Sequence, residues 1–180
     1  MPRRYLLLDA CVAINLAATG NVESIAQVLS TTFLIVDQAA SEMGYLRDEV
    51  DGQLVQTPID LNRYVTAGAV QLLSLNDGEL DQYVALAAVV DDGEAATITI
   101  AASRGLLMAT DDRKARRVCT EQGVLEPVRS LNILHSYADA ASLNEESIRE
   151  LLVRIRSRAS FRPPSVDPDY KWWSSHVGEA

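Results

Sequence analysis

Short apolar runs alternate along the chain with longer stretches that have apolar residues at helical spacing. The short runs predict buried strands at 5–8, 33–36, 70–75, 106–109 and, as a short fifth strand, 125–128. The longer stretches predict helices at 10–18, 22–30, 38–48, 60–66, 79–90, 94–103, 112–122, 130–140 and 144–158. Strands that alternate with helices predict an α/β fold with a mostly parallel sheet.

Between these elements the sequence predicts loops and an appendage. The stretch 51–58 is interpreted as a loop, and 161–180, rich in Pro, Asp and Ser, as an irregular tail. The length of 180 residues suits one ordinary core. We therefore expect one main domain at 1–140 and a C-terminal helix and tail at 141–180, with Trp172-Trp173 packing on the chain's own domain.

Acidic residues stand beside several of the apolar runs. Asp9 directly follows the strand at 5–8, and Asp111-Asp112 follow the strand at 106–109. In open α/β sheets, ligands bind beyond the carboxyl ends of the strands, so this position favours a site. Glu42 lies off the apolar face of its predicted helix, and Glu94 lies in a first helical turn. We expect Asp9, Glu42, Glu94 and Asp112 to converge.

Carboxylates grouped in this way point to a divalent cation. Mg²⁺ and Mn²⁺ prefer oxygen ligands, and both assist phosphodiester hydrolysis. A cluster of like charges is unfavourable without a cation, so it indicates function rather than folding. Each acid also has a structural interpretation, because Asp9 and Asp112 could cap helices, Glu94 could complement a helix dipole and Glu42 could be solvated.

Charge is unevenly distributed along the chain. The formal net charge of -9 argues against coating nucleic acid by bulk electrostatics. Basic residues nevertheless gather in the later part, and four of them begin just beyond the predicted acidic site: Arg113, Lys114, Arg116 and Arg117. A helix amino terminus there favours anions, so these residues could bind substrate phosphates. The alternative is a solvated basic face.

Cysteine usage and hydropathy further narrow the class of protein that the sequence predicts. Cys11 and Cys119 are far apart and lack the spacing of a zinc site or a disulfide framework, so we expect small buried side chains. No apolar run is long enough to cross a bilayer, and the first residues do not read as a signal peptide. The sequence therefore predicts a cytoplasmic protein without a membrane partner.

Four segments together carry a resemblance to a known family. They are Leu7-Leu8-Asp9, Ser41-Glu42-Met43, Asp92-Gly93-Glu94-Ala95 and Thr110-Asp111-Asp112-Arg113-Lys114-Ala115-Arg116. Their order and spacing resemble the PIN-domain nucleases, most nearly the VapC-like prokaryotic members. The resemblance implies a three-layer sandwich in which Asp9, Glu42, Glu94 and Asp112 hold Mg²⁺ or Mn²⁺. It also places Thr110 at a substrate-site hydroxyl and leaves Asp111 as a rival to Asp112.

The same resemblance implies a function and partners. It predicts a metal-dependent endoribonuclease that cleaves RNA, of the kind that acts as the toxin of a toxin–antitoxin pair, with an antitoxin partner and a homodimeric state. Two positions depart from the family pattern, because Ala10 replaces a common Ser or Thr and Glu94 replaces the commoner Asp. Ala10 and the acidic surface suggest the competing hypothesis, a PIN-like module that binds RNA or protein without cutting.

Overall fold

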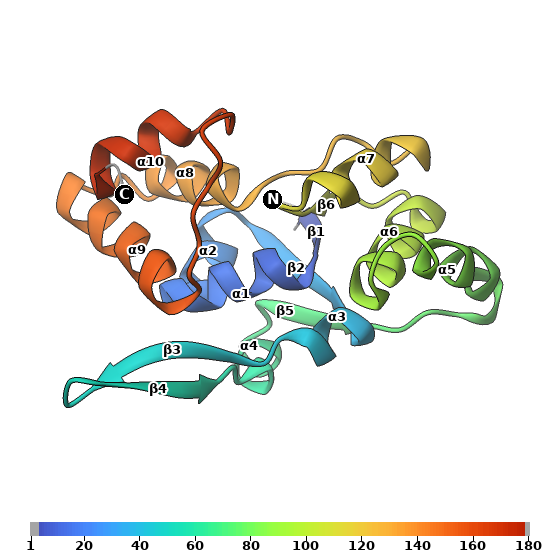
Figure 1. The fold of residues 1–180 in the computed structure, drawn as a ribbon, viewed down its shortest axis with the longest axis horizontal. Helices are drawn as coiled ribbons and strands as arrows, with labels where there is room; N and C mark the ends of the chain where they lie inside the picture. The colour runs from blue at the N-terminus through green and yellow to red at the C-terminus, as the bar shows by residue number, and fades with distance from the viewer. Residues whose placement is uncertain (1–3, 179–180) are drawn as a thin grey trace.

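The computed structural model describes residues 4–178, and a four-stranded parallel sheet lies at its centre (Figure 1). The strand order is β5-β2-β1-β6. The strands are β1 (Arg4–Leu8), β2 (Thr31–Val36), β5 (Val70–Leu73) and β6 (Met108–Ala109). A single parallel bridge between Ala109 and Val128 occupies the place of the predicted fifth strand. The predicted parallel α/β architecture is confirmed.

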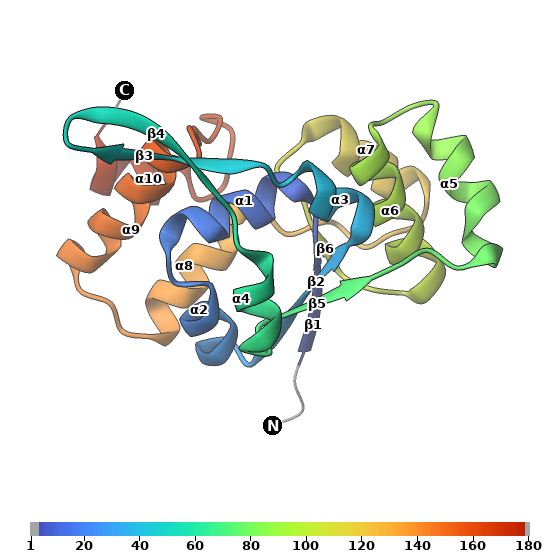
Figure 2. The same ribbon diagram turned by 90° about the horizontal axis from the view of Figure 1, so that it is seen from below.

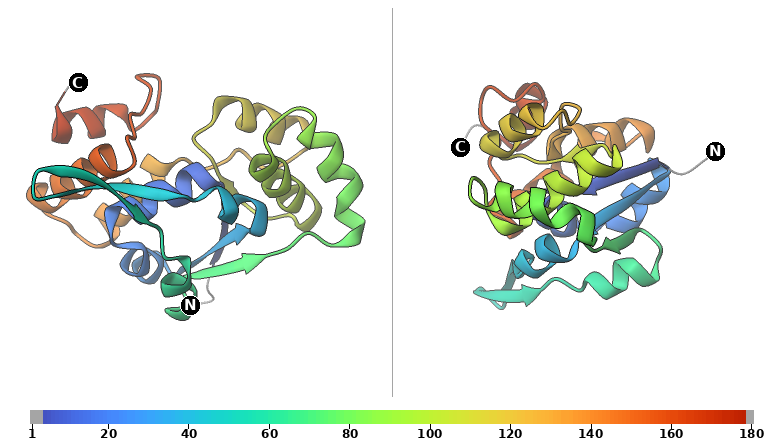
Figure 3. Two further views of the ribbon diagram at one scale, coloured as in Figure 1. Left: turned by 60° about the horizontal axis from the view of Figure 1, so that its bottom comes forward. Right: turned by 90° about the vertical axis from the view of Figure 1, so that its right-hand side faces the viewer.

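Helices cover both faces of the sheet, as Figure 3 shows from two sides. The helices of the first half are α1 (Ala10–Thr19), α2 (Val22–Val28), α3 (Asp37–Glu42), α4 (Leu61–Thr66) and α5 (Leu80–Ala87), which follows a 3-10 turn, η1 (Asp77–Glu79). Those of the second half are α6 (Asp92–Arg104), α7 (Arg113–Glu121), α8 (Ser130–Ala140), α9 (Glu145–Arg158) and α10 (Tyr170–Val177).

Alternation along the strands divides the core into two layers. Leu6 and Leu8 of β1 are buried with residues of α1, α2, α8 and α9, whereas Leu7 is buried with residues of α5, α6 and α7. Successive side chains of a strand point to opposite faces, so a wholly apolar strand supplies both layers. The sheet and its two helical layers form the predicted three-layer sandwich.

One segment differs from the prediction. The helix expected at 38–48 ends at Glu42, and the expected loop at 51–58 is part of a hairpin of β3 (Tyr45–Val50) and β4 (Gln53–Pro58). Asp51 and Gly52 both have positive φ, 51° and 76°, as a two-residue type I′ turn requires. Residues such as Met43, Leu46 and Val50 mimic helical spacing, but the Asp-Gly pair marked the hairpin.

The hairpin is tied to the C-terminal half of the chain. Leu46 is buried, and Asp48 accepts hydrogen bonds from Arg158 Nε and Nη2 at 2.6 and 3.2 Å. Arg47 Nη1 donates to Ser160 Oγ at 2.7 Å. These contacts join residues more than one hundred positions apart, and β3 packs beside α9 (Figure 2).

The tail is more ordered than the prediction of an irregular segment. It contains α10, in which Trp173 is 5% exposed and makes a T-shaped contact with Phe161, with ring centroids 5.5 Å apart. Trp172 stacks on His135 of α8 at 4.5 Å. The self-packing prediction for the tryptophan pair is confirmed. Arg129 also forms an ion pair with the buried Asp167 at 3.2 Å, which fixes the segment before α10.

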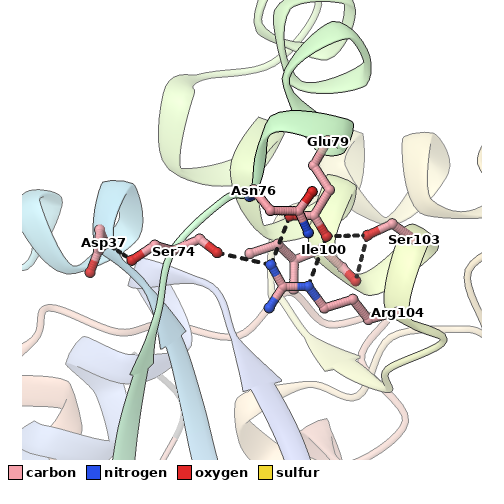
Figure 4. A network of polar contacts seen from close by, with 7 residues as sticks. All are labelled: Asp37, Ser74, Asn76, Glu79, Ile100, Ser103 and Arg104. Atoms are coloured by element: carbon pink, nitrogen blue, oxygen red, sulfur yellow. Dashed lines mark hydrogen bonds and ion pairs between the residues drawn. The ribbon is translucent and has the colours of Figure 1, made fainter.

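A second polar network stabilises the junction between β5 and α6 (Figure 4). The side chain of Glu79 is 4% exposed, and its two oxygens accept from Arg104 Nε and Nη2, each at 2.7 Å. Ser103 Oγ donates to the same carboxylate at 2.6 Å. The Arg104 hydrogen bonds hold the pKa of Glu79 down at about 2. This buried carboxylate is therefore satisfied by its neighbours and is separate from the acids considered below.

Candidate metal centre

Asp9 lies at the point where β1 ends and α1 begins, and it is 3% exposed. Its Oδ1 accepts from the backbone N–H of Ala10 at 2.7 Å, which caps α1. Its Oδ2 accepts from Thr110 Oγ1 at 2.9 Å and from Cys11 Sγ at 3.1 Å. Burial raises the pKa of Asp9, although the bonds from Cys11 and Thr110 act in the opposite direction. The side chain of Asp9 thus caps α1 and is also held in a fixed orientation at the strand ends.

Thr110 has a different role from the predicted one. It is fully buried, and its hydroxyl donates to Asp9 while accepting from the backbone N–H of Asp112 at 3.1 Å. A side chain without exposed surface cannot contact an RNA substrate. The expected substrate-binding role of Thr110 is therefore wrong, and its hydroxyl instead connects the two acids of β1 and β6.

Glu42 lies at the end of α3 and reaches the start of α6. Its Oε1 accepts from the backbone N–H of Gly93 at 2.8 Å. A Cβ at Gly93 would lie 2.6 Å from Glu42 Cδ and 2.7 Å from Oε1, so only glycine leaves room for this carboxylate. Partial burial raises the pKa of Glu42, and the charges of Asp91 and Asp9 raise it further. Glu42 thus faces the same region as Asp9.

Glu94 occupies the first turn of α6, and its pKa is the most strongly perturbed of the predicted metal ligands. Burial, followed by the charges of Asp91, Asp9 and Asp112, raises the pKa of Glu94 to about 7. A carboxyl shifted in this way holds a proton near neutral pH when no cation is present. Glu94 is therefore the residue where the crowding of negative charge is most evident.

The two adjacent aspartates after β6 face different surroundings. Asp112 is exposed, caps α7 through a 2.8 Å bond from Ala115 N–H, and acts electrostatically on Glu94. Asp111 accepts from Ser130 N–H at 2.9 Å, from Ser130 Oγ at 2.6 Å and from Asn15 Nδ2 at 3.0 Å. The carboxylate of Asp111 is thus occupied in joining α1 to α8. Asp112 is the member of the pair that lies beside the other acids.

The four predicted acids lie around the carboxyl end of the sheet, where the charges of Asp9 and Asp112 act on Glu94 and the charge of Asp9 also acts on Glu42. The start of β1 lies at the opposite end of the sheet from α1 and α3 (Figure 2). Three helices begin at this region, α1, α6 and α7, each capped by an aspartate: Asp9, Asp91 and Asp112. Their amino termini carry partial positive charge, which partly offsets the clustered carboxylates and favours a bound anion.

The donor set fits a hard divalent cation. It consists of carboxylate oxygens alone, the ligands that Mg²⁺ and Mn²⁺ prefer. Within residues 4–178, no three Asp, Glu, His or Cys side chains lie close enough to enclose one ion. Magnesium is usually held by one or two carboxylates together with several waters. Acids that lie near one another can therefore bind it without surrounding the ion completely. Like charges without a cation stay apart.

The basic side chains of α7 differ in whether they bind another group of the chain or face solvent. Arg116 Nη1 donates to the backbone oxygen of Asp111 at 2.7 Å, and Arg117 lies 3.6 Å from Glu121. Arg113 and Lys114 are exposed in the first turn of α7, next to Asp112. Of the four predicted phosphate-binding residues, Arg113 and Lys114 are thus the ones whose charge faces solvent beside the acids.

Sequence reasoning missed two residues of this region. Asp91 caps α6 by accepting from Glu94 N–H at 2.9 Å, and its charge acts on Asp9, Glu42 and Glu94. Gly93 makes room for Glu42 and bonds to it. The Asp-x-x-Glu spacing before an apolar run is a helix-start signal that could have identified Asp91. Nothing local marks Gly93, because its partner is 51 positions away.

The raised pKa of Glu94 predicts an unusual dependence of stability on pH. The folded chain holds this proton more tightly than the unfolded chain, in which the pKa of Glu94 is near its ordinary value of 4.5. The free energy of unfolding of the metal-free protein should therefore fall as pH rises from about 4.5 through about 7. Chemical denaturation in EDTA at a series of pH values measures this fall.

Two comparisons test that assignment. Glu94→Gln should flatten the pH dependence, because the substituted amide does not titrate. Saturating Mn²⁺ should restore stability above pH 7, because a ligand that binds only the folded state stabilises it. Equal pH profiles for the Glu94→Gln variant and the wild-type protein would contradict the assignment to Glu94.

Comparison with known proteins places this α/β chain in a class. The pattern of the family DUF3368, a PIN domain, matches residues 6–166, so the chain belongs to this PIN-domain family. PIN domains are a nuclease-type superfamily. The match begins in β1 and runs through α9 into the segment that follows it.

One solved structure is also similar. It is a PilT N-terminus domain protein from the hyperthermophilic archaeon Sulfolobus solfataricus P2, with 13% sequence identity and a TM-score of 0.44. The alignment covers 74% of this chain and 92% of that one. A search of curated proteins found no match. Within the described residues, no helix combines the length and apolarity needed to span a membrane.

Proposed function

We propose that this PIN-domain protein is a divalent-metal-dependent endoribonuclease. The observation that carries the proposal is that Asp9, Glu42, Glu94 and Asp112 lie around one end of the sheet, where burial and the charges of Asp91, Asp9 and Asp112 raise the pKa of Glu94 to about 7. A fold gains no stability from such crowding, so a functional cation is the economical explanation. Mg²⁺ or Mn²⁺ suits the all-oxygen donor set.

The chain's own residues have defined tasks under this proposal. Asp9 and Asp112 would bind the cation, held in orientation by the hydroxyl of Thr110 and the backbone of α7. Glu42 and Glu94 would complete the binding directly or through waters, and Glu94 would release its proton when the cation binds. When bound, the cation lowers the pKa of a coordinated water and neutralises charge on the phosphate. Arg113 and Lys114 would attract the RNA backbone.

The direct test is cleavage of structured RNA by the purified protein. We expect cleavage in Mn²⁺, loss of cleavage in EDTA and recovery on adding excess Mn²⁺. Asp112→Asn should lose at least about a hundredfold in rate. Asp111→Asn, its neighbour, should mainly lower the unfolding temperature, because it weakens the bonds to Ser130 and Asn15. Cleavage that continues unchanged in EDTA would remove the proposal.

The VapC-like toxin role is a finer part of the same proposal. A toxin requires a protein partner, and three exposed apolar side chains, Leu80 and Val84 of α5 and Val89 of the turn that follows it, offer apolar surface for one. We propose an antitoxin, a second copy of the chain, or both as occupants of such surfaces. Light scattering of the protein alone and with the product of an adjacent small gene distinguishes these partners.

The competing function is a PIN-like module that binds RNA or protein without cutting. Ala10 favours it, because a hydroxyl at that position would otherwise lie beside Asp9. In this chain, however, the thiol of Cys11 and the hydroxyl of Thr110 already donate to Asp9 Oδ2. RNA binding with no cleavage in Mn²⁺, Mg²⁺ or Co²⁺ would favour the binding module.

A further inference from the structure

A groove opens beside the acidic centre and is bounded by the chain's C-terminal segment. Its volume is about 450 Å³. One wall comes from the start of α1 and from the loop after β6, with Cys11, Asn15 and Asp112. The other wall comes from the residues that follow α9, among them Phe161 and Arg162. The volume suits one small ligand or one nucleotide, since such sites measure about 300–1,000 Å³.

The groove is continuous with the proposed metal centre. Asp112 belongs to both, and the thiol of Cys11, which lines the groove, lies 3.1 Å from Asp9 Oδ2. A molecule seated in the groove therefore has one end next to the predicted metal ligands. The groove is thus placed for a part of the substrate that adjoins the reacting bond.

The C-terminal wall is held firmly in place. Ser160 has a φ of 56°, a left-handed conformation that turns the chain sharply after α9, and its hydroxyl accepts from Arg47 at 2.7 Å. The rings of Phe161 and Trp173 are in T-shaped contact. Further along, the ion pair of Asp167 with Arg129 anchors the segment again. This wall is preorganised, which lowers the entropic cost of binding.

Arg162 differs from three other arginines of the C-terminal half of the chain. Arg129, Arg156 and Arg158 each bond to a carboxylate or a backbone oxygen of the chain. Within the described residues, Arg162 makes no hydrogen bond or ion pair, although it is exposed and lines the groove. An unpaired guanidinium facing a groove is suited to a phosphate, which it can bind through two parallel hydrogen bonds.

We propose that this groove binds a single-stranded RNA nucleotide that flanks the cleaved phosphodiester, with Arg162 on a phosphate and Phe161 against the base. Aromatic rings and arginines are the groups that bind unpaired nucleotides, whereas a stacked duplex cannot insert one base into a groove of this size. The statement that the nucleotide flanks the cleaved bond rests on the proposed nuclease function; the groove itself rests on its own contacts.

The binding test uses the full chain carrying Asp9→Asn, with Mn²⁺ and a fluorescent single-stranded RNA of about eight nucleotides. Arg162→Ala should weaken the Kd about five- to twentyfold and make it less sensitive to salt. The matched control is Arg149→Ala, because Arg149 is also exposed and lies outside the groove on α9. It should leave the Kd within about twofold. Equal Kd values for the two variants would overturn the proposal.

A second measurement, in the otherwise wild-type chain, separates this inference from the nuclease proposal. Arg162→Ala should raise the KM for single-stranded RNA about five- to twentyfold and leave kcat nearly unchanged. If the Arg162→Ala variant cleaved RNA with an unaltered KM and Kd, the groove proposal would be wrong and the nuclease proposal would stand. If the wild-type protein did not cleave RNA but Arg162→Ala still weakened RNA binding, the nuclease proposal would be wrong and the groove proposal would stand. Equal affinity for duplex RNA would overturn the single-strand assignment.

Discussion

Gly93→Ala is expected to lower Mn²⁺ affinity and RNA cleavage about ten- to a hundredfold while leaving the fold intact. The new methyl group would lie 2.7 Å or less from the Glu42 carboxylate, so Glu42 must leave its position and its bond to the Gly93 N–H. Gly93 is the second residue of α6 and has no positive φ, so its backbone conformation is one that alanine, the better helix former, also adopts. Function should fall while stability holds or rises.

The chain offers a matched control for this substitution. Gly44 lies two residues after Glu42, has no atom within 4 Å of a built Cβ and has no positive φ. Gly44→Ala should therefore retain metal affinity and cleavage. Calorimetric titration with Mn²⁺ and thermal unfolding of both variants provide the measurements. If the Gly93→Ala variant bound Mn²⁺ with wild-type affinity, the position of Glu42 against α6 would not contribute to metal binding.

Asp9→Asn is expected to reduce RNA cleavage about a thousandfold or more, which corresponds to about 4 kcal/mol of lost transition-state stabilisation. Asp9 is the most buried of the four acids, and its charge acts on both Glu42 and Glu94. Removing that charge weakens cation binding more than the loss of an exposed ligand would. The measurement is the initial rate of RNA cleavage in Mn²⁺ for the variant and for the wild-type protein.

The same substitution should affect stability in the opposite sense. Burial raises the pKa of Asp9, so its ionised form costs folding free energy at neutral pH. In EDTA at pH 8, Asp9→Asn should unfold at the same temperature as the wild-type protein or above it, because the amide oxygen can still accept from Ala10 or Thr110. In Mn²⁺ the order of the two unfolding temperatures should reverse, so that the wild-type protein unfolds above Asp9→Asn. A variant that unfolds in EDTA well below the wild-type protein would show that Asp9 acts mainly in structure.

The parts of the fold that follow from local sequence could be predicted. The runs around Leu7 and Leu34 are apolar on both faces, which only a sheet between two helical layers satisfies. Because acids that directly follow such strands must lie at the carboxyl edge, the positions of Asp9 and Asp112 followed from topology. Glu42 and Glu94 were placed by their positions on predicted helices, which are weaker signals than a preceding strand, and the resemblance supported both.

The parts that depend on distant contacts could not be predicted. Residues 45–50 form a strand because they pair with 53–58 and because Arg158 binds Asp48, so Asp51-Gly52 was the one local signal against the helical spacing of Leu46 and Val50. The different environments of Asp111 and Asp112 depend on Ser130 and Asn15, which come from other elements. The groove requires the turn at residue 160 to meet the start of α1, which no local pattern records.

A crystal of the protein soaked with Mn²⁺ tests the central claim most directly, through the anomalous scattering of the metal. The account predicts a peak coordinated by Asp9 and Asp112, with Glu42 and Glu94 bound to it directly or through ordered waters. A soaked crystal with no peak among these four side chains, or with the ion held instead by Asp111 and Asp167, would contradict it.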